Sequence, residues 1–169
     1  MPADLTTVLG RLLVDPALRA ELRRDPARVA RMLDADALAL REIEGDDLER
    51  QAETLVDKRF REVGKLLPLT LASLGAAAAR IFREHALLHW PEGHRRHAAD
   101  AEAFIRFLEE RKLPRSASEL NRLRFARGRG RLSLRFVADA WVGGRPRRAL
   151  QLLYRCRGAV RSLVFYAEF

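Results

Sequence analysis

The spacing of hydrophobic residues predicts that the first two-thirds of the chain is helical. Leucine and valine recur at helical intervals over residues 5–14, and the strongest amphipathic pattern runs over residues 46–68. In that segment one stripe is apolar, aspartates lie at the start and Pro68 lies at the end, which suits a helix and its dipole. Further helices are expected over residues 69–89 and 96–112.

Two Asp-Pro pairs mark the starts of short helices near the N-terminus. Asp15-Pro16 and Asp25-Pro26 each place a good N-cap residue before a proline, which is favoured at the first helical position. The similar segments raise the alternative of a repeat, but two capped helices explain the pattern without one. Residues 34–45 continue the helical pattern, and Gly45 is expected to end it.

The period of the pattern changes from 3.6 to 2 in the C-terminal part. Strands are predicted over residues 131–138, 149–156 and 159–169, and the short loops between them favour an antiparallel meander. The predicted fold class is therefore α+β. A helical body is expected over residues 1–112, and a short helix followed by a basic three-stranded antiparallel sheet is expected over residues 113–169.

Charge is distributed unevenly along the chain. Residues 1–110 hold 17 basic and 20 acidic side chains, whereas residues 111–169 hold 15 basic and 3 acidic ones, a net charge of +12. Such a basic third favours an anionic partner, either nucleic acid or an acidic peptide or protein, over a merely solvated surface. Arginine and phenylalanine interleave over residues 122–136, as they do in RNA-binding segments. The simpler interpretation is an amphipathic strand with arginine outward and phenylalanine inward, because no RNA-stacking motif accompanies it.

All four histidines lie within residues 85–97, which raises the question of a metal site. His85 and His89 have the i, i+4 spacing of two zinc ligands on one helix face. Four other residues of the same stretch could complete a ligand shell, namely Glu84, Glu92, His94 and His97. Arginines crowd this stretch and oppose a dication, and no HExxH or CxxC motif supports a site. We therefore predict no metal ligand here, and expect helix-end histidines that bond to carbonyls or an acidic neighbour.

Catalytic motifs give no support for an enzyme. Cys156 lies in a predicted strand without a histidine nearby in sequence, no GxSxG motif is present, and the RGRG of residues 127–130 lacks the GK[ST] of a P-loop. We predict no catalytic residue and no cofactor in this chain. A single cysteine excludes an internal disulfide, no apolar run approaches about 20 residues, and a secretion signal is not recognisable, so a cytoplasmic protein without a membrane span is expected.

Four stretches in a fixed order, followed by a sheet, carry a family resemblance. They are LGRLLVDPALRAEL (9–22), DKRFREVGKLLPLTLASLG (57–75), WPEGHRRHAADAEAFIRFL (90–108) and ELNRLRF (119–125). Together they resemble a family of small partner proteins that accompany multinuclear non-haem iron-dependent oxidative enzymes. Those enzymes modify cysteines and neighbouring residues in ribosomally made precursor peptides, as in the methanobactin-biosynthesis heterodimer. The resemblance covers roughly residues 5–165.

The resemblance implies a non-catalytic role in a heterodimer. A separate barrel-type oxidase chain would hold the iron, since a barrel needs about 200 or more residues of its own. This chain would bind that enzyme and present the leader of an acidic, cysteine-bearing precursor peptide. The resemblance leaves open whether the motif residues form the framework or the enzyme interface; these residues are Lys58, Arg59, Glu62, Trp90, Pro91, His97 and Asp100.

The predicted sheet suits such a peptide-recognition role. A three-stranded meander has two open edges, and an extended peptide can add a strand there through backbone hydrogen bonds. The candidate edges are residues 131–137 and 160–167, and nearby arginines would select an acidic leader by charge-assisted bonds. The predicted peptide-binding residues are Arg131, Ser133, Arg135, Arg161 and Ser162. The alternative function is nucleic-acid binding by the same basic third.

Overall fold

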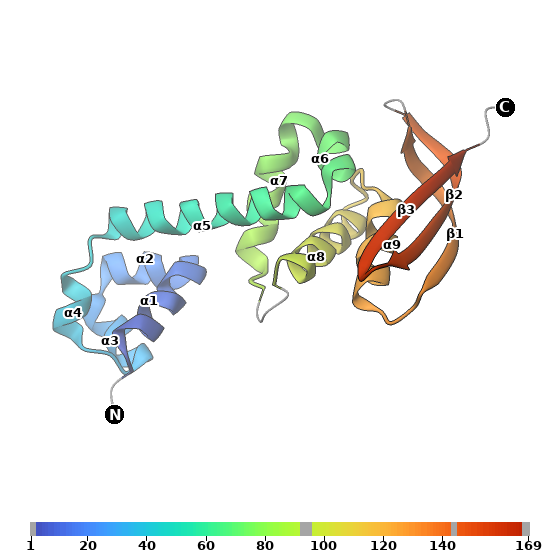
Figure 1. Cartoon of the computed structure of the whole chain (residues 1–169). Coiled ribbons are helices and arrows are strands. Elements are labelled where there is room, and N and C mark those ends of the chain that lie inside the picture. Colours follow the sequence, from blue (N-terminus) through green and yellow to red (C-terminus); the bar gives the residue numbers. More distant parts are fainter. Residues whose placement is uncertain (1–2, 92–95, 143–144, 167–169) are drawn as a thin grey trace. The chain divides into compact units, whose positions relative to one another are not determined.

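The computed structural model confirms the α+β class, with helices followed by a three-stranded antiparallel sheet (Figure 1). It describes residues 3–91, 96–142 and 145–166, with the backbone alone for 139–142 and 145–146. The chain divides into two compact units. The first comprises Met1–Phe60 and Ala86–Trp90, and the second comprises Arg61–His85 and Pro91–Phe169. The boundary predicted after residue 112 falls inside the second unit.

The first unit begins with four short helices. They are α1 (Leu5–Val14), α2 (Pro16–Arg24), α3 (Pro26–Leu33) and α4 (Ala37–Arg41). The predicted caps are confirmed. The Asp15 carboxylate accepts the backbone N–H of Ala17 at 2.9 Å and of Leu18 at 3.1 Å, and Asp25 accepts that of Arg28 at 3.0 Å. Each cap satisfies donors that the first turn of a helix leaves without a partner.

Apolar side chains from these helices and from the start of α5 (Gly45–Leu66) form one buried cluster. Its members are Val8, Leu12, Leu18, Leu22, Val29, Ala30, Leu33, Leu40 and Leu48. The expectation that Gly45 ends a helix is wrong, because α4 stops at Arg41 and Gly45 is the first residue of α5. Asp46 and Asp47 follow in the first turn of α5, where negative charge favours the positive end of the helix dipole.

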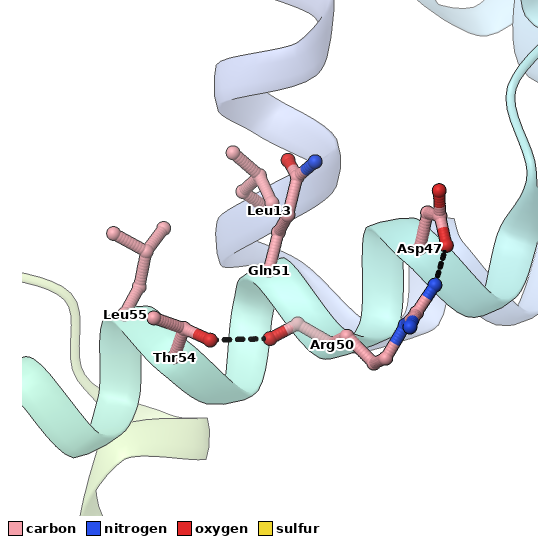
Figure 2. Close-up of a pocket in the computed structure, with 6 residues that line it drawn as sticks. All are labelled: Leu13, Asp47, Arg50, Gln51, Thr54 and Leu55. Carbon is pink, nitrogen blue, oxygen red and sulfur yellow. Dashed lines mark hydrogen bonds and ion pairs between the residues drawn. The ribbon is translucent and has the colours of Figure 1, made fainter.

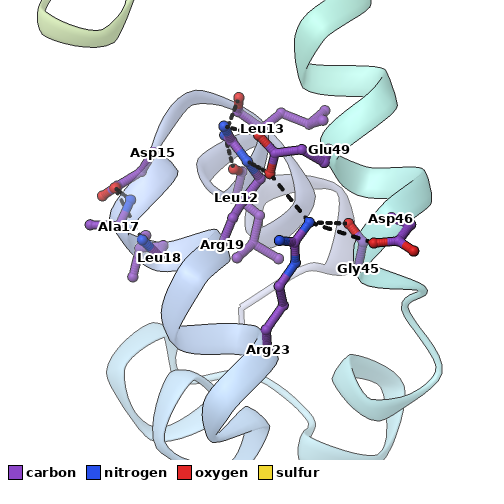
Figure 3. A network of polar contacts seen from close by, with 10 residues as sticks. All are labelled: Leu12, Leu13, Asp15, Ala17, Leu18, Arg19, Arg23, Gly45, Asp46 and Glu49. Atoms are coloured by element: carbon purple, nitrogen blue, oxygen red, sulfur yellow. Dashed lines mark hydrogen bonds and ion pairs between the residues drawn. The ribbon is translucent and has the colours of Figure 1, made fainter.

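A buried arginine ties α2 to α1 and α5 (Figure 3). Arg19 Nη1 donates to the carbonyl oxygens of Leu12 and Leu13, both at 3.0 Å, at the C-terminal end of α1. Its Nε and Nη2 donate to the two carboxylate oxygens of Glu49 at 2.9 and 3.1 Å. This hydrogen bonding by Arg19 lowers the pKa of Glu49 below its usual value. Arg19 was not recognised in the sequence, because an arginine in a short amphipathic helix resembles a surface residue.

The helix expected over residues 69–89 is broken into three pieces. These are α6 (Pro68–Leu74), a 3₁₀ turn at Gly75–Ala77, and α7 (Ala78–Leu88). Gly75 has φ +56°, a left-handed conformation that ends α6 and that glycine adopts at little cost. Among the described residues, no single helix combines the length and apolarity of a membrane span; only the bent pair of α5 with α6–α7 reaches them together.

Helix α9 (Ala117–Arg127) forms hydrogen bonds to both sides of the junction between α5 and α6. Arg122 donates to the carbonyl oxygen of Leu66 at 2.8 Å, at the C-terminal end of α5. The buried carboxylate of Glu119 accepts the backbone N–H groups of Leu69 at 2.7 Å and Thr70 at 2.9 Å, at the start of α6. A cation thus meets the negative end of one helix and an anion the positive end of the next. Burial raises the pKa of Glu119, against the lowering effect of these hydrogen bonds.

The sheet follows α9 and has the predicted meander order. Its strands are β1 (Leu132–Val142), β2 (Arg145–Cys156) and β3 (Ala159–Tyr166), with β2 in the centre and both pairings antiparallel. Arg157 and Gly158 form the turn between β2 and β3, both with positive φ. Two such residues suit the tight turn that follows the twist of a hairpin. The sheet packs against α9 within the second unit (Figure 1).

Candidate functional site

The two faces of the sheet differ in what covers them. On the inner face Val137 and Ala149 are buried against Ala117 of α9. On the outer face of β1, Leu132, Leu134 and Phe136 are 68%, 60% and 81% exposed. The expectation of phenylalanine inward and arginine outward on this strand is therefore wrong. A period of 2 separates two faces but does not say which one the rest of the protein covers.

A buried glutamine fixes the inner face to α9. Gln151 is 1% exposed, and its amide nitrogen donates to the Ser118 carbonyl at 2.9 Å and to the Ser162 hydroxyl at 3.2 Å. Its amide oxygen accepts from the Asn121 side chain at 3.2 Å. Because a buried amide is costly without partners, these bonds select one position of the helix on the sheet. Sequence reasoning missed this residue, whose polar side chain lies within the otherwise apolar run of residues 149–153.

Arg155 stabilises the C-terminal end of α9. Its guanidinium donates to the carbonyl oxygens of Phe125, Ala126 and Gly128 at 3.3, 3.4 and 3.0 Å. These carbonyls lie at the C-terminal end of the helix, where no further helical N–H group is available to donate to them. Part of the basic excess of the C-terminal third therefore stabilises the fold.

Both outer strands of the sheet have an open edge among the residues that the structure describes. The Arg155 N–H donates to the Arg131 carbonyl at 3.0 Å, so this pair of residues is hydrogen-bonded across β1 and β2. In an antiparallel ladder such pairs alternate with pairs whose backbone N–H and C=O groups point away from the partner strand. With the observed register, the N–H groups of Leu132, Leu134 and Phe136 point to the open edge of β1. On β3 the same alternation turns the even-numbered residues, including Ser162 and Val164, to the open edge.

The predicted peptide-binding residues are distributed over both edges. Arg131 directly precedes β1 and Arg135 lies on β1, and both are exposed. Arg161 lies exposed on β3, on the other side of β2. The half-buried Ser133 directs its N–H toward β2, so it offers no donor at the open edge. The hydroxyl of Ser162 accepts from Gln151, although its N–H points outward.

The residues proposed for the enzyme interface separate into buried and accessible ones. Arg59 is buried, donates to the His89 carbonyl at 2.8 Å and lies 4.7 Å from the ring centre of Trp90. Trp90 itself is half-buried, and Lys58 is exposed. Arg59 therefore fixes the chain at Trp90 within the first unit.

The second unit holds the other members of that set. Pro91 is buried, His97 is half-buried, and Glu62 is half-buried and accepts from Lys65 at 2.7 Å. Asp100 is fully buried, so its carboxylate belongs to the framework. Accessible polar groups of the two motifs are thus found at Lys58 and Glu62.

His85 pairs with this buried aspartate. The His85 Nε2 atom lies 3.1 Å from Asp100 Oδ1, and the two residues are 2% and 0% exposed. The imidazole lies among aromatic rings, with the ring centres of Phe82, Phe104 and Phe107 at 5.6, 5.4 and 5.4 Å. The acidic neighbour expected from the sequence is thus Asp100, on α8 (Arg96–Glu110).

No metal centre is formed by the described part of the chain. No three histidine, cysteine or carboxylate side chains in residues 3–91, 96–142 and 145–166 gather in a way that could hold a metal ion. Glu92 and His94 lie outside the described residues. The Nδ1 atom of His97 is buried and has no hydrogen-bond partner among the described residues.

Surface hollows within the described residues offer two further candidates for a site. The first is lined by Leu13, Asp47, Arg50, Gln51, Thr54 and Leu55 (Figure 2). Three of its polar residues are paired along α5, Arg50 with Asp47 and the Thr54 hydroxyl with the Arg50 carbonyl at 2.8 Å. The second lies on the sheet and is lined by Phe136, Arg147, Arg148, Ala149, Leu150, Phe165 and Tyr166. The second joins apolar and cationic groups, which suits binding rather than catalysis.

Comparison of the chain with protein-family models, with curated proteins and with solved structures found no match.

Proposed function

We propose that this chain is a non-catalytic, cytoplasmic partner protein that binds the leader of an acidic precursor peptide at an open edge of its C-terminal sheet. It would form a heterodimer with a separate multinuclear iron oxidase, which holds the iron and modifies the peptide. The observation that carries the proposal is the pair of open edges, each with outward backbone groups beside an exposed arginine. The ordered motifs that resemble the partner-protein family supply the identity of the peptide and of the enzyme.

The chemistry of binding follows from the edges. A peptide that lies alongside β1 would accept from and donate to the backbone of Leu132, Leu134 and Phe136. Backbone pairing supplies affinity with little dependence on sequence, and side chains supply selection. Arg131 and Arg135 beside the edge of β1, or Arg161 on β3, would favour carboxylates in the leader by charge-assisted hydrogen bonds.

A pair of proline variants tests strand addition. Leu134→Pro removes an outward N–H from β1, and Val164→Pro removes one from β3, so each variant controls for the other. Binding of a fluorescent acidic peptide of alternating Glu and Val is measured by anisotropy, with circular dichroism to verify folding. We expect one variant to weaken binding at least tenfold and the other to bind as the parent does. If both fold and both bind like the parent, strand addition is refuted.

Nucleic-acid binding is the second candidate, favoured by the net charge of +12 over residues 111–169. It predicts affinity for duplex DNA or single-stranded RNA that falls steeply as salt rises, because phosphate binding releases counterions. Retention of nucleic acid at 0.2 M salt, unaffected by either proline variant, would favour this function over peptide binding.

A further inference from the structure

The outer face of the sheet is an apolar surface that the described residues leave open. The strand register aligns three rows across it: Phe136, Leu150 and Phe165; then Leu134, Leu152 and Leu163; then Leu132, Tyr154 and Arg161. Four of these side chains, Leu132, Leu134, Phe136 and Phe165, are more than half exposed. Contiguous apolar surface of this kind marks an interaction site in soluble proteins.

We propose that this outer face binds an acidic amphipathic helix of a protein partner. The site uses the side chains of the face and not the backbone groups of the strand edges, and it does not depend on the peptide-binding function proposed above. Backbone chemistry, dimensions and charge each point to this occupant.

Backbone chemistry favours a helix over an extended segment on this face. The central strand β2 pairs with a neighbour on each side, so the face offers side chains and no free backbone groups. An extended peptide laid on it would leave its own N–H and C=O groups without partners, at a substantial cost. A helix satisfies its backbone internally and presents an apolar stripe. The inner face of the same sheet already packs against a helix, α9.

The dimensions also fit one helix. Strands lie about 4.8 Å apart and every second residue advances about 6.7 Å, so the three rows span about 10 by 13 Å between side-chain positions. A helix is about 10–12 Å wide and rises 1.5 Å per residue, so about three turns would cover the rows.

Charge selects an acidic partner. Arg161 ends the last row, and Arg148 borders the hollow at the opposite end beside Phe136 and Phe165. Residues 131–166 contain eight arginines and one acidic residue, Asp139. A second copy of the chain would bring this excess against itself and be repelled, whereas glutamates beside an apolar stripe would pair with the arginines.

The test uses two synthetic peptides of 18 residues with leucine at i, i+3, i+4 and i+7. One carries glutamate at the flanking positions and the other carries lysine there. The protein variant is Leu152→Gln, because Leu152 lies on the central strand and reaches the face without touching either edge. The control is Leu38→Gln, which changes a leucine that is 69% exposed on α4.

We expect the glutamate peptide to bind at least tenfold more tightly than the lysine peptide. Leu152→Gln should weaken its binding at least tenfold. Leu38→Gln and Val164→Pro should bind it as the parent does, because Val164 lies in register with Gln151 on the opposite face of the sheet. The proposal is overturned if folded Leu152→Gln binds equally well. It is also overturned if sedimentation shows a dimer that Leu152→Gln dissociates, or if anionic phosphatidylglycerol vesicles bind this face and the glutamate peptide does not. Failure of the edge variants alone would refute the peptide function and leave this site intact.

Discussion

Replacement of Arg19 by methionine is the substitution with the clearest energetic consequence. Methionine keeps the aliphatic stem of the side chain and removes all four hydrogen bonds of the guanidinium (Figure 3). Two of these go to the carbonyls of Leu12 and Leu13, which end α1, and two go to Glu49. Arg19 is 7% exposed, so water has little access to replace them.

The expected loss can be worked out from these contacts. Each hydrogen bond to a charged group contributes about 1.5–3 kcal/mol, and a buried acceptor left alone costs about 1–3 kcal/mol. The contributions are not additive within one network, so we expect Arg19→Met to lower the free energy of unfolding by about 3–4 kcal/mol. Glu49→Gln leaves both carbonyl bonds in place. Because the Glu49 side chain is 38% exposed, we expect Glu49→Gln to lower the free energy of unfolding by only about 1 kcal/mol.

The two variants also differ in their dependence on pH. Because the hydrogen bond from Arg19 lowers the pKa of Glu49 in the folded protein, the ion pair stabilises the fold fully above the ordinary glutamate pKa of 4.5. This contribution is lost as pH falls through the lowered, folded-state pKa. The difference in stability between the parent and Glu49→Gln should therefore shrink below pH 4.5, while Arg19→Met stays less stable than the parent.

Urea unfolding followed by circular dichroism at several pH values measures these differences. Arg19→Lys is the matched control, since lysine keeps the charge but cannot reach both the carbonyls and the carboxylate as a planar fork does. Equal losses for Arg19→Met and Glu49→Gln would refute the reasoning, because the carbonyls of α1 would then contribute nothing.

Two further predictions concern the histidine-rich stretch. His85→Leu should cost about 3 kcal/mol in urea unfolding because it leaves the Asp100 carboxylate buried without this partner, and the double variant with Asp100→Leu should be less harmful than the two single costs added together. Fully additive losses would show that the pair does not interact. Elemental analysis of the gently purified chain should find no stoichiometric transition metal, given the arginines around residues 85–97 and the pairing of His85. Zinc or iron near one ion per chain, lost in His85→Ala, would contradict this.

Local signals in the sequence were sufficient where a residue acts on its own neighbours. Asp15 and Asp25 cap helices through backbone groups two or three residues away, so the Asp-Pro pairs located both starts. Gly75 lies inside the range predicted as one helix, residues 69–89, and its positive φ divides that range. Glycine is compatible with both a close helix contact and a left-handed turn, and the pattern alone does not distinguish them.

In the candidate site, too, local features could be predicted from the sequence and long-range contacts could not. The change to period 2 at Leu132 located the sheet and its two open edges, because alternation and short loops are local features. The outward direction of Phe136 was missed, because α9 covers the other face through contacts such as those of Gln151 with Ser118 and Asn121. Similarly, the roles of Arg59 and Asp100 as framework residues depend on partners that are distant in sequence.

By itself the sequence determined the α+β class, the strand order, the starts of α2 and α3 and the basic charge of the C-terminal third. These follow from hydrophobic periodicity, capping chemistry and composition, which act over a few residues or over the chain as a whole. Only the tertiary structure decided which face of the sheet is open and which polar residues are buried. Glu119 is an example of a buried polar residue of this kind. Its carboxylate accepts hydrogen bonds at the start of α6 from residues 49 and 50 positions away, and a short-range sequence pattern does not predict such a contact. Whether a residue is buried depends on what packs against it, and that packing depends on the fold of the whole chain.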